Sequence, residues 1–232
     1  MKSALHHLLL AATSVLLSAC AVLSGPEPPT RVLLLGDSIS IGYHAAVVEA
    51  LGPEFTVARP MANPEKGRAE NCEGTTKGVK AIERWLALEG GDWDVIHFNF
   101  GLHDLKRVDP ETRRNSNDPA DPNQADLATY TSQLTAIVEA LEATGATLIL
   151  ATTTPVPTGG VRPHRDPEDV VRYNAGARGI AEPRGIAVDD LYSFILPRLA
   201  ELQKPVDVHF TAEGSAALGG EVARAIRSAV SR

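Results

Sequence analysis

The feature that most constrains the fold of this chain is a short apolar run that ends in Gly36, Asp37 and Ser38. Residues 32–35 are consecutive large aliphatic side chains. A run this short is typical of a central parallel strand that is buried on both faces, because a helix needs a longer segment. Residues 39–51 then read as a helix. The sequence therefore places Ser38 at the carboxyl end of a buried strand, where open α/β sheets bind ligands.

The start of the predicted helix also suits chemistry on Ser38. Free backbone N–H groups and the positive end of the helix dipole favour a developing oxyanion, and the N–H of Ser38 is the first donor that we expect. A purely structural interpretation stays open at this point, in which Ser38 only caps its helix.

The rest of the chain alternates strands and helices. We expect further strands at residues 55–58, 94–100, 146–151 and 186–189. We expect helices at 75–88, 125–143, 167–181, 191–202 and 212–230, and polar loops at 61–74, 105–123 and 152–165. Strands separated by helices are joined by right-handed crossovers, so this order predicts an α/β fold around a mostly parallel five-stranded sheet.

Composition adds only broad limits. With 44% hydrophobic and 22% charged residues among 232, the chain is an ordinary globular protein with one main domain, which we place at residues 31–232. The net charge is −7 and no basic cluster stands out, which argues against a nucleic-acid partner.

Residues 1–19 have the layout of a secretory signal peptide, with an apolar core at 8–17 that is too short to span a membrane. The ending at Cys20 resembles the lipobox of bacterial lipoproteins, in which the peptide is cut before a cysteine that receives a lipid. This resemblance implies lipid attachment at Cys20, a proline-rich tether over 20–30, and a place in the bacterial cell envelope, at the outer membrane in a Gram-negative organism. A plain signal peptide with an incidental cysteine, and hence secretion, is the alternative.

Two histidines lie at positions that suit catalysis. His103 follows the strand at 94–100 and His209 precedes the last helix, so both are expected near the edge of the sheet that carries Ser38. A histidine beside such a serine can remove the hydroxyl proton and return it to the leaving group. A carboxylate or carbonyl on its other nitrogen then sets the tautomer. Taken alone, either histidine can also be structural.

Together these segments resemble the SGNH (GDSL-type) hydrolase family over nearly the whole mature chain. Gly36-Asp37-Ser38 matches the first block of the family, Gly-Leu-His-Asp at 101–104 its third block Gly-x-Asn-Asp, and residues 207–209 its last block. The resemblance implies a three-layer α/β/α sandwich of flavodoxin type, in which Ser38 is the nucleophile, His209 the base and Asp207 its carboxylate. It also implies that no metal or organic cofactor is used.

The oxyanion hole departs from the family pattern. His103 stands where the family has an asparagine that donates to the oxyanion, and a ring N–H can fill the same role. Asn71 and Asn99 are other candidate donors. Gly74 is the nearest match to the glycine of the second block, so the resemblance assigns the hole to Ser38, Gly74 and His103.

The last block also departs from the pattern. The family usually spaces these residues as Asp-x-x-His, whereas position 206 is a valine and Asp207 is one residue closer to His209. Asp207 can still reach the imidazole, or a backbone carbonyl can orient it instead.

Other chemistries fit the sequence less well. No Gly-x-Ser-x-Gly elbow precedes a helix. His97 and His103 flank the end of a strand without a third ligand at metal spacing, and His97 is expected in the core. Cys72 can be a nucleophile, but we interpret it as a structural thiol.

The expected function is the removal of a short acyl group, in particular acetyl from a carbohydrate. The few aromatic residues and the polar segment 105–123 argue against a lipid groove, and Arg107, Arg113 and Arg114 on that segment could contact an acidic sugar. Two alternatives stay open: an O-acetyltransferase that acts on a polysaccharide, and a lipoprotein that binds glycans without catalysis.

Overall fold

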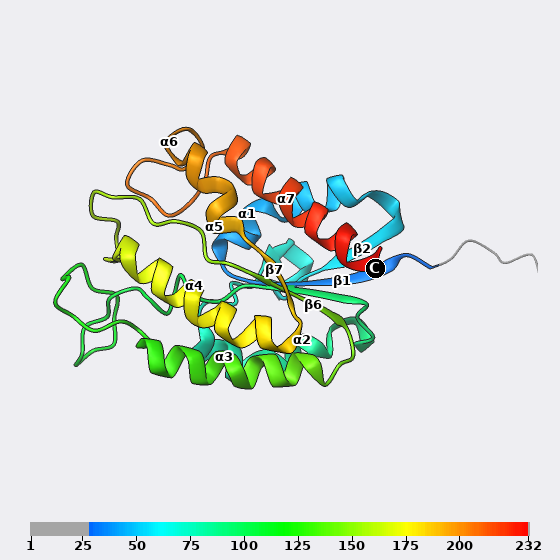
Figure 1. Ribbon diagram of the computed structural model, residues 1–232, viewed down its shortest axis with the longest axis horizontal. Helices are drawn as coiled ribbons and strands as arrows, with labels where there is room; N and C mark the ends of the chain where they lie inside the picture. Colours follow the sequence, from blue (N-terminus) through cyan, green and yellow to red (C-terminus); the bar gives the residue numbers. More distant parts are fainter. Residues whose placement is uncertain (1–27, 232) are drawn as a thin grey trace, which may run out of the picture.

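The computed structural model describes residues 28–231 (Figure 1). The predicted signal peptide at 1–19 and the lipid-attachment residue Cys20 lie outside the described residues. The first strand begins at Thr30, one residue before the predicted start of the domain. Within residues 28–231, none of the helices combines the length and the apolar character needed to cross a bilayer.

The centre of the molecule is a parallel five-stranded sheet in the order β2-β1-β5-β6-β7, which confirms the predicted flavodoxin-like topology. Its strands are β1 (Thr30–Leu35), β2 (Phe55–Ala58), β5 (Val95–Phe98), β6 (Thr147–Ala151) and β7 (Ala187–Asp189). The central strand β1 is apolar and buried from Val32 to Leu35 because helices cover both of its faces. Burial of each such side chain stabilises the folded state by roughly 1.5–3 kcal/mol.

Helices cover the sheet on both faces, as the family resemblance implies (Figure 1). The helices are α1 (Ser38–Leu51), α2 (Thr75–Leu86), α3 (Leu127–Glu142), α4 (Pro167–Ala181), α5 (Leu191–Ile195), α6 (Leu199–Leu202) and α7 (Ala212–Val230). One face carries α1 and α7 with α5 and α6 beside them, and the other carries α2, α3 and α4.

Helices α1 and α7 pack closely, although they lie at opposite ends of the domain sequence. A glycine permits this contact: a Cβ added at Gly219 would lie 2.6 Å from the Cβ of Ala46 and 2.9 Å from the carbonyl oxygen of Tyr43. Helix α1 begins at Ser38 and α7 begins just after His209. The packing of these two helices therefore sets the relative positions of the two residues.

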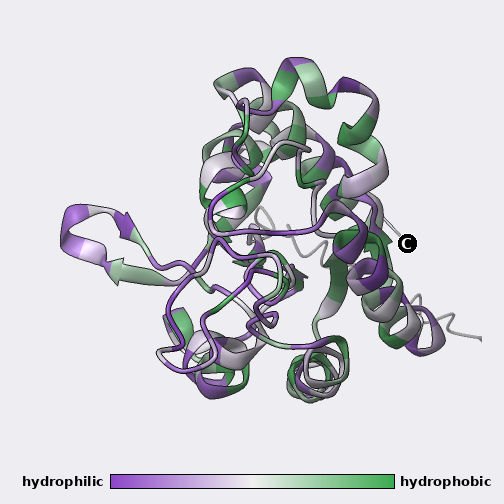
Figure 2. Cartoon of the chain, turned by 90° about the vertical axis from the view of Figure 1, so that its left-hand side faces the viewer, coloured by the Kyte–Doolittle hydropathy of each residue, from purple (hydrophilic) through white to green (hydrophobic). Residues whose placement is uncertain are grey.

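Two elements differ from the sequence-based expectation. The predicted loop at 61–74 contains a small antiparallel hairpin, β3 (Met61–Asn63) and β4 (Arg68–Ala69), which projects from the body of the molecule (Figure 2). The predicted helix at 191–202 is two short helices, α5 and α6, because Pro197 falls in a tight 3-10 turn between them.

Candidate active site

The turn between β1 and α1 leaves the hydroxyl of Ser38 free. Asp37 caps the helix instead, because its carboxylate accepts a hydrogen bond of 2.9 Å from the N–H of Ile39. Gly36 is required here, since a Cβ at this position would lie 2.8 Å from Ser40 Oγ. The interpretation of Ser38 as a mere helix cap is therefore wrong.

Ser38, His209 and Asp207 form a hydrogen-bonded triad. The distance from Ser38 Oγ to His209 Nε2 is 2.9 Å, and His209 Nδ1 lies 2.7 Å from Asp207 Oδ1. Burial raises the pKa of Asp207, but hydrogen bonds from the His209 backbone and ring outweigh it and lower the pKa below its usual value. Because an ionised carboxylate only accepts, Nδ1 carries the proton and Nε2 accepts from the Ser38 hydroxyl.

The unusual spacing of Asp207 and His209 is accommodated by the backbone. Val206 adopts a left-handed conformation with φ of 54°, which is rare for a β-branched residue. The N–H of Asp207 donates to Lys204 O at 3.2 Å, which closes a tight turn. This turn brings Asp207 back to the imidazole, so the carboxylate, and not a backbone carbonyl, is its partner.

Gly74 and His103 lie on two loops that contact one another. Asp104, which is buried next to His103, accepts hydrogen bonds of 2.8 Å from Thr75 N and 2.5 Å from Thr75 Oγ1. A Cβ at Gly74 would lie 2.8 Å from the Asp104 carboxylate, so only glycine fits there. This contact supports the match of Gly74 to the second block of the family.

His103 is neutral. Burial, followed by the nearby charges of Lys106 and Arg165, lowers the pKa of His103 to about 3. Its Nδ1 atom is buried without a hydrogen-bond partner among residues 28–231. A neutral imidazole keeps one N–H, so His103 can still donate one hydrogen bond.

The two alternative donors, Asn99 and Asn71, use their side chains differently. The amide of Asn99 donates to Ala151 O at 2.8 Å and faces Thr153 Oγ1 at 3.4 Å, so it is used in joining strand ends. The side-chain oxygen of Asn71 accepts from Glu73 N at 2.8 Å in a local turn.

With this geometry, the comparison of the sequence with known families decides the assignment: residues 34–217 match the GDSL-like lipase/acylhydrolase family. The chain belongs to this family. It is a serine esterase of the GDSL (SGNH) type. No curated protein matches the chain in sequence.

Solved structures share the fold of this GDSL hydrolase at low sequence identity. A lipase/acylhydrolase from Enterococcus faecalis is 21% identical, with a TM-score of 0.66 over 86% of this chain and 96% of that chain. A catalytic mutant of an acetylxylan esterase from Geobacillus stearothermophilus is 18% identical, with a TM-score of 0.65 over 85% and 94% of the two chains. An aryl esterase from M. smegmatis is 14% identical, with a TM-score of 0.61 over 86% and 99%.

Ser38 and His209 of the hydrolase line one groove of about 550 Å³ between α1 and α7. Most of its other lining residues on the two helices are small: Gly42, Ala45, Ala46, Ala212, Ser215 and Ala216. The rest of the lining consists of Ile39 and Glu49 on α1 and of Lys204, Phe210 and Thr211 before α7. Because the groove contains the hydrogen-bonded pair, it can hold the group attached to the reacting ester.

Sequence analysis missed Arg165, which lies in the loop after β6. It is only 6% exposed, and its Nε donates to Leu102 O at 2.8 Å, next to His103. Burial lowers the pKa of Arg165 to about 10, so the guanidinium is charged at neutral pH. No sequence motif marked this residue, because its segment reads only as a proline- and threonine-rich loop.

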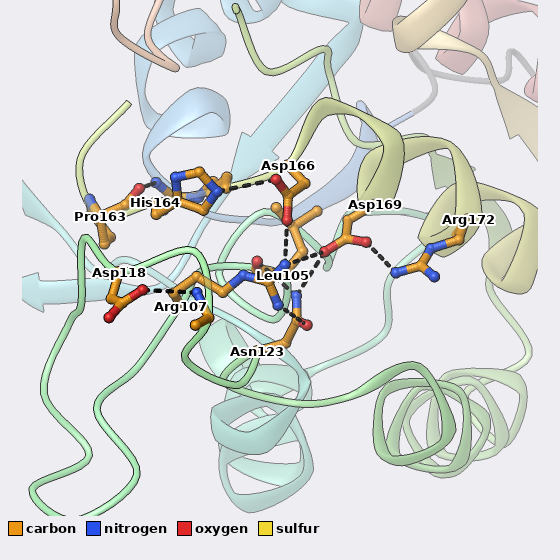
Figure 3. Close-up of polar contacts among 11 residues, drawn as sticks. Leu105, Arg107, Asp118, Asn123, Pro163, His164, Asp166, Asp169 and Arg172 are labelled. Atoms are coloured by element: carbon orange, nitrogen blue, oxygen red, sulfur yellow. Dashed lines mark hydrogen bonds and ion pairs between the residues drawn. The ribbon is translucent and has the colours of Figure 1, made fainter. Parts of the chain in front are cut away.

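The polar segment 105–123 is attached to the start of α4 by an ion-pair network, shown in Figure 3. Arg107 contacts Asp166 and lies 3.5 Å from the buried Asp169, and it donates to Asn123 Oδ1 at 2.5 Å. Since its guanidinium is occupied in this way, the expectation that Arg107 contacts an acidic sugar is not supported.

The remaining candidates are structural. His97 is 1% exposed and pairs with Asp189 at 2.9 Å inside the core, as predicted. Burial raises the pKa of the Cys72 thiol to about 12, which leaves it protonated and inert. Residues 28–231 contain no cluster of three potential metal ligands.

Proposed function

We propose that this hydrolase removes a short acyl group, in particular acetyl from a carbohydrate, through a covalent acyl-Ser38 intermediate. The observation that carries the proposal is the hydrogen-bonded triad, in which His209 Nε2 faces Ser38 Oγ and His209 Nδ1 faces Asp207. In this arrangement the base lies within reach of the nucleophile, and a third group orients the base.

The first step of the reaction forms a tetrahedral intermediate. His209 Nε2 takes the hydroxyl proton while Ser38 Oγ attacks the acyl carbon, and the ionised Asp207 stabilises the imidazolium that results. The oxyanion accepts hydrogen bonds from the N–H groups of Ser38 and Gly74, neither of which donates to another described residue. We assign a third donor to the ring of His103.

The next steps form the acyl-enzyme and then release the acid. His209 returns its proton to the leaving alcohol as the carbon–oxygen bond of the ester breaks. Water then attacks the acyl carbon with His209 as base, and Ser38 recovers its proton as the acid departs. Because His209 protonates the alcohol, the alcohol lies on its side of Ser38, where the groove between α1 and α7 begins.

The choice of a short acyl group on a carbohydrate rests on two supports. Acetylxylan esterases are among the proteins of similar fold. The groove is open and lined mainly by small side chains, with Ile39 and Phe210 as its larger apolar residues, unlike the long apolar channel that a fatty acyl chain requires.

The decisive test replaces the nucleophile. Ser38→Ala should lower kcat on 4-nitrophenyl acetate by four orders of magnitude or more, roughly as in other serine hydrolases. Its thermal unfolding midpoint should stay near that of the wild type, because the side chain caps no helix. A serine-directed phosphonate should label the wild type once, at Ser38, and should not label the variant. Full activity in Ser38→Ala would overturn the assignment.

A further inference from the structure

Two buried cations lie beside His103 without an ion-pair partner. Lys106 is 9% exposed and Arg165 is 6% exposed. Among residues 28–231, no carboxylate lies within 4.0 Å of either charged group, although many arginines of this chain form such pairs. A buried charge without a partner lowers the stability of the folded state, so two such charges side by side are unusual.

The position of Arg165 is fixed by backbone carbonyls. Its Nε donates to Leu102 O at 2.8 Å and its Nη1 donates to Pro163 O at 3.2 Å. The first of these bonds holds the guanidinium against the residue that precedes His103. Lys106 follows three residues after His103 on the same loop, and its side chain makes no hydrogen bond to a described residue.

Both charged ends keep some contact with solvent. The ammonium of Lys106 and the Nη2 atom of Arg165 have no described partner, yet neither belongs to the fully buried polar atoms without one. These two charged ends are therefore the points at which a small anion from solvent would contact the pair. The Arg165 side chain is held by two hydrogen bonds and the Lys106 side chain is largely buried, so little side-chain entropy remains to be lost when a ligand binds.

The electrostatics of the unliganded site favour an anion. The two cations repel one another, since the charge of Arg165 lowers the pKa of Lys106 after the larger effect of burial. Asp37 and Asp207 act on Arg165, and Glu73 and Asp104 act on Lys106, but only at longer range. An anion placed between the cations would relieve the repulsion and supply the missing partner.

We propose that Lys106 and Arg165 form an anion subsite beside His103, which binds a carboxylate carried by the ester substrate. The inference rests on the proposed function and extends it from neutral short esters to esters with a negative charge on the acyl or the alcohol part. An acetylated uronic acid carries such a charge on the alcohol part, and a hemisuccinate carries it on the acyl part.

The test compares matched substrates that differ in one charge. One pair is the methyl glycoside of a mono-acetylated glucuronic acid and the corresponding glucoside; the other is 4-nitrophenyl hemisuccinate and 4-nitrophenyl butyrate. For each pair, the measurement is the ratio of kcat/KM for the anionic ester to that for the neutral ester. The pair that shows a ratio above one identifies which part of the substrate bears the charge.

Lys106→Met and Arg165→Met should each lower this ratio about 10-fold or more, the usual effect of losing one charge-assisted hydrogen bond. Arg68→Met is the matched control, because Arg68 is an exposed arginine on the β3–β4 hairpin and makes no side-chain hydrogen bond to a described residue. The ratio should stay unchanged in that variant.

Two outcomes would overturn the subsite. One is a wild-type ratio of one or less for both pairs; the other is an unchanged ratio in both variants, which would show that the cations serve the oxyanion or the fold. If Arg165→Met fails to fold, Lys106→Met decides the question. Hydrolysis of the neutral ester, and its loss in Ser38→Ala, tests the proposed function separately.

Discussion

His103 shows how one residue couples the site to pH. The family carries asparagine at this position, and asparagine does not titrate. The folded protein holds the His103 ring neutral down to a pKa of about 3, whereas an exposed histidine takes up a proton near pH 6.5. Between these values, only the unfolded chain binds the proton at this residue.

This difference makes His103 a source of acid sensitivity. Because the unfolded state gains protons as the pH falls below 6.5, His103 destabilises the fold there, by about 2 kcal/mol at pH 5 relative to pH 7. We expect His103→Asn to unfold less readily at pH 5 than the wild type, with a smaller difference at pH 7. Urea titrations at both pH values measure this. An equal pH dependence in both proteins would show that the ring is protonated in the folded state.

The same variant bears on catalysis, since asparagine keeps a donor and alanine does not. His103→Asn should retain part of the esterase activity, whereas His103→Ala should lose roughly 100-fold in kcat. Alanine as active as wild type would mean that another group fills the oxyanion hole.

At the residue scale, local motifs predicted Ser38, His209 and Gly74 because each lies at an end of an element that the sequence pattern reveals. The reach of Asp207 could not be predicted. It depends on the left-handed backbone of Val206, a conformation that a valine gives no reason to expect. Arg165 was missed because its burial results from tertiary packing alone.

The network around Arg107 acts at the scale of an element. It attaches the segment 105–123, which has no helix of its own, to the start of α4 (Figure 3). Backbone bonds such as that from Val108 N to Pro122 O complete the arrangement. The backbone of the adjacent Lys106 is therefore held in place by contacts that lie outside the catalytic triad.

Arg107→Met should loosen this segment, because the buried Asp169 loses one of its cationic partners. We expect faster amide hydrogen exchange over residues 107–123, with little change in α7, and a loss of about 1–3 kcal/mol in the free energy of unfolding. Arg114→Met, which changes an exposed arginine of the same segment, is the control. Equal exchange in both variants would contradict the role of the network.

At this scale, the buried strands and amphipathic helices followed their sequence patterns closely. The predicted strand at 94–100 proved shorter, since β5 runs from Val95 to Phe98, and the side chain of Asn99 after it joins the end of β6. The hairpin at 61–69 has short strands with glycine and proline between them, so the pattern could not separate it from a loop.

At the scale of the whole molecule, the chain joins its two ends at the site. The nucleophile comes from the start of the domain and the base from its end, and the parallel sheet brings them to one edge. Alternating strands and helices were enough to predict this convergence. The distance between the two side chains depends on how α1 and α7 pack, which no short motif specifies.

The predicted lipid anchor also belongs to this scale. Cys20→Ser should leave the protein without lipid and shift it from the membrane fraction to the soluble fraction, because the lipid on Cys20 is the anchor that the lipobox resemblance implies. Detergent phase partitioning of cell extracts measures the shift. A variant that stays in the detergent phase would rule out attachment at Cys20.

The contact at Gly219 has a consequence for heat inactivation. It lies roughly 10 Å along α7 from the end nearest His209, at 1.5 Å of rise per residue. A small tilt of α7 about this pivot would move the base away from Ser38 while the sheet and both helices stay intact. Heating should therefore inactivate the enzyme over a range of temperature in which circular dichroism still reports a native fold. Cooling should restore its turnover.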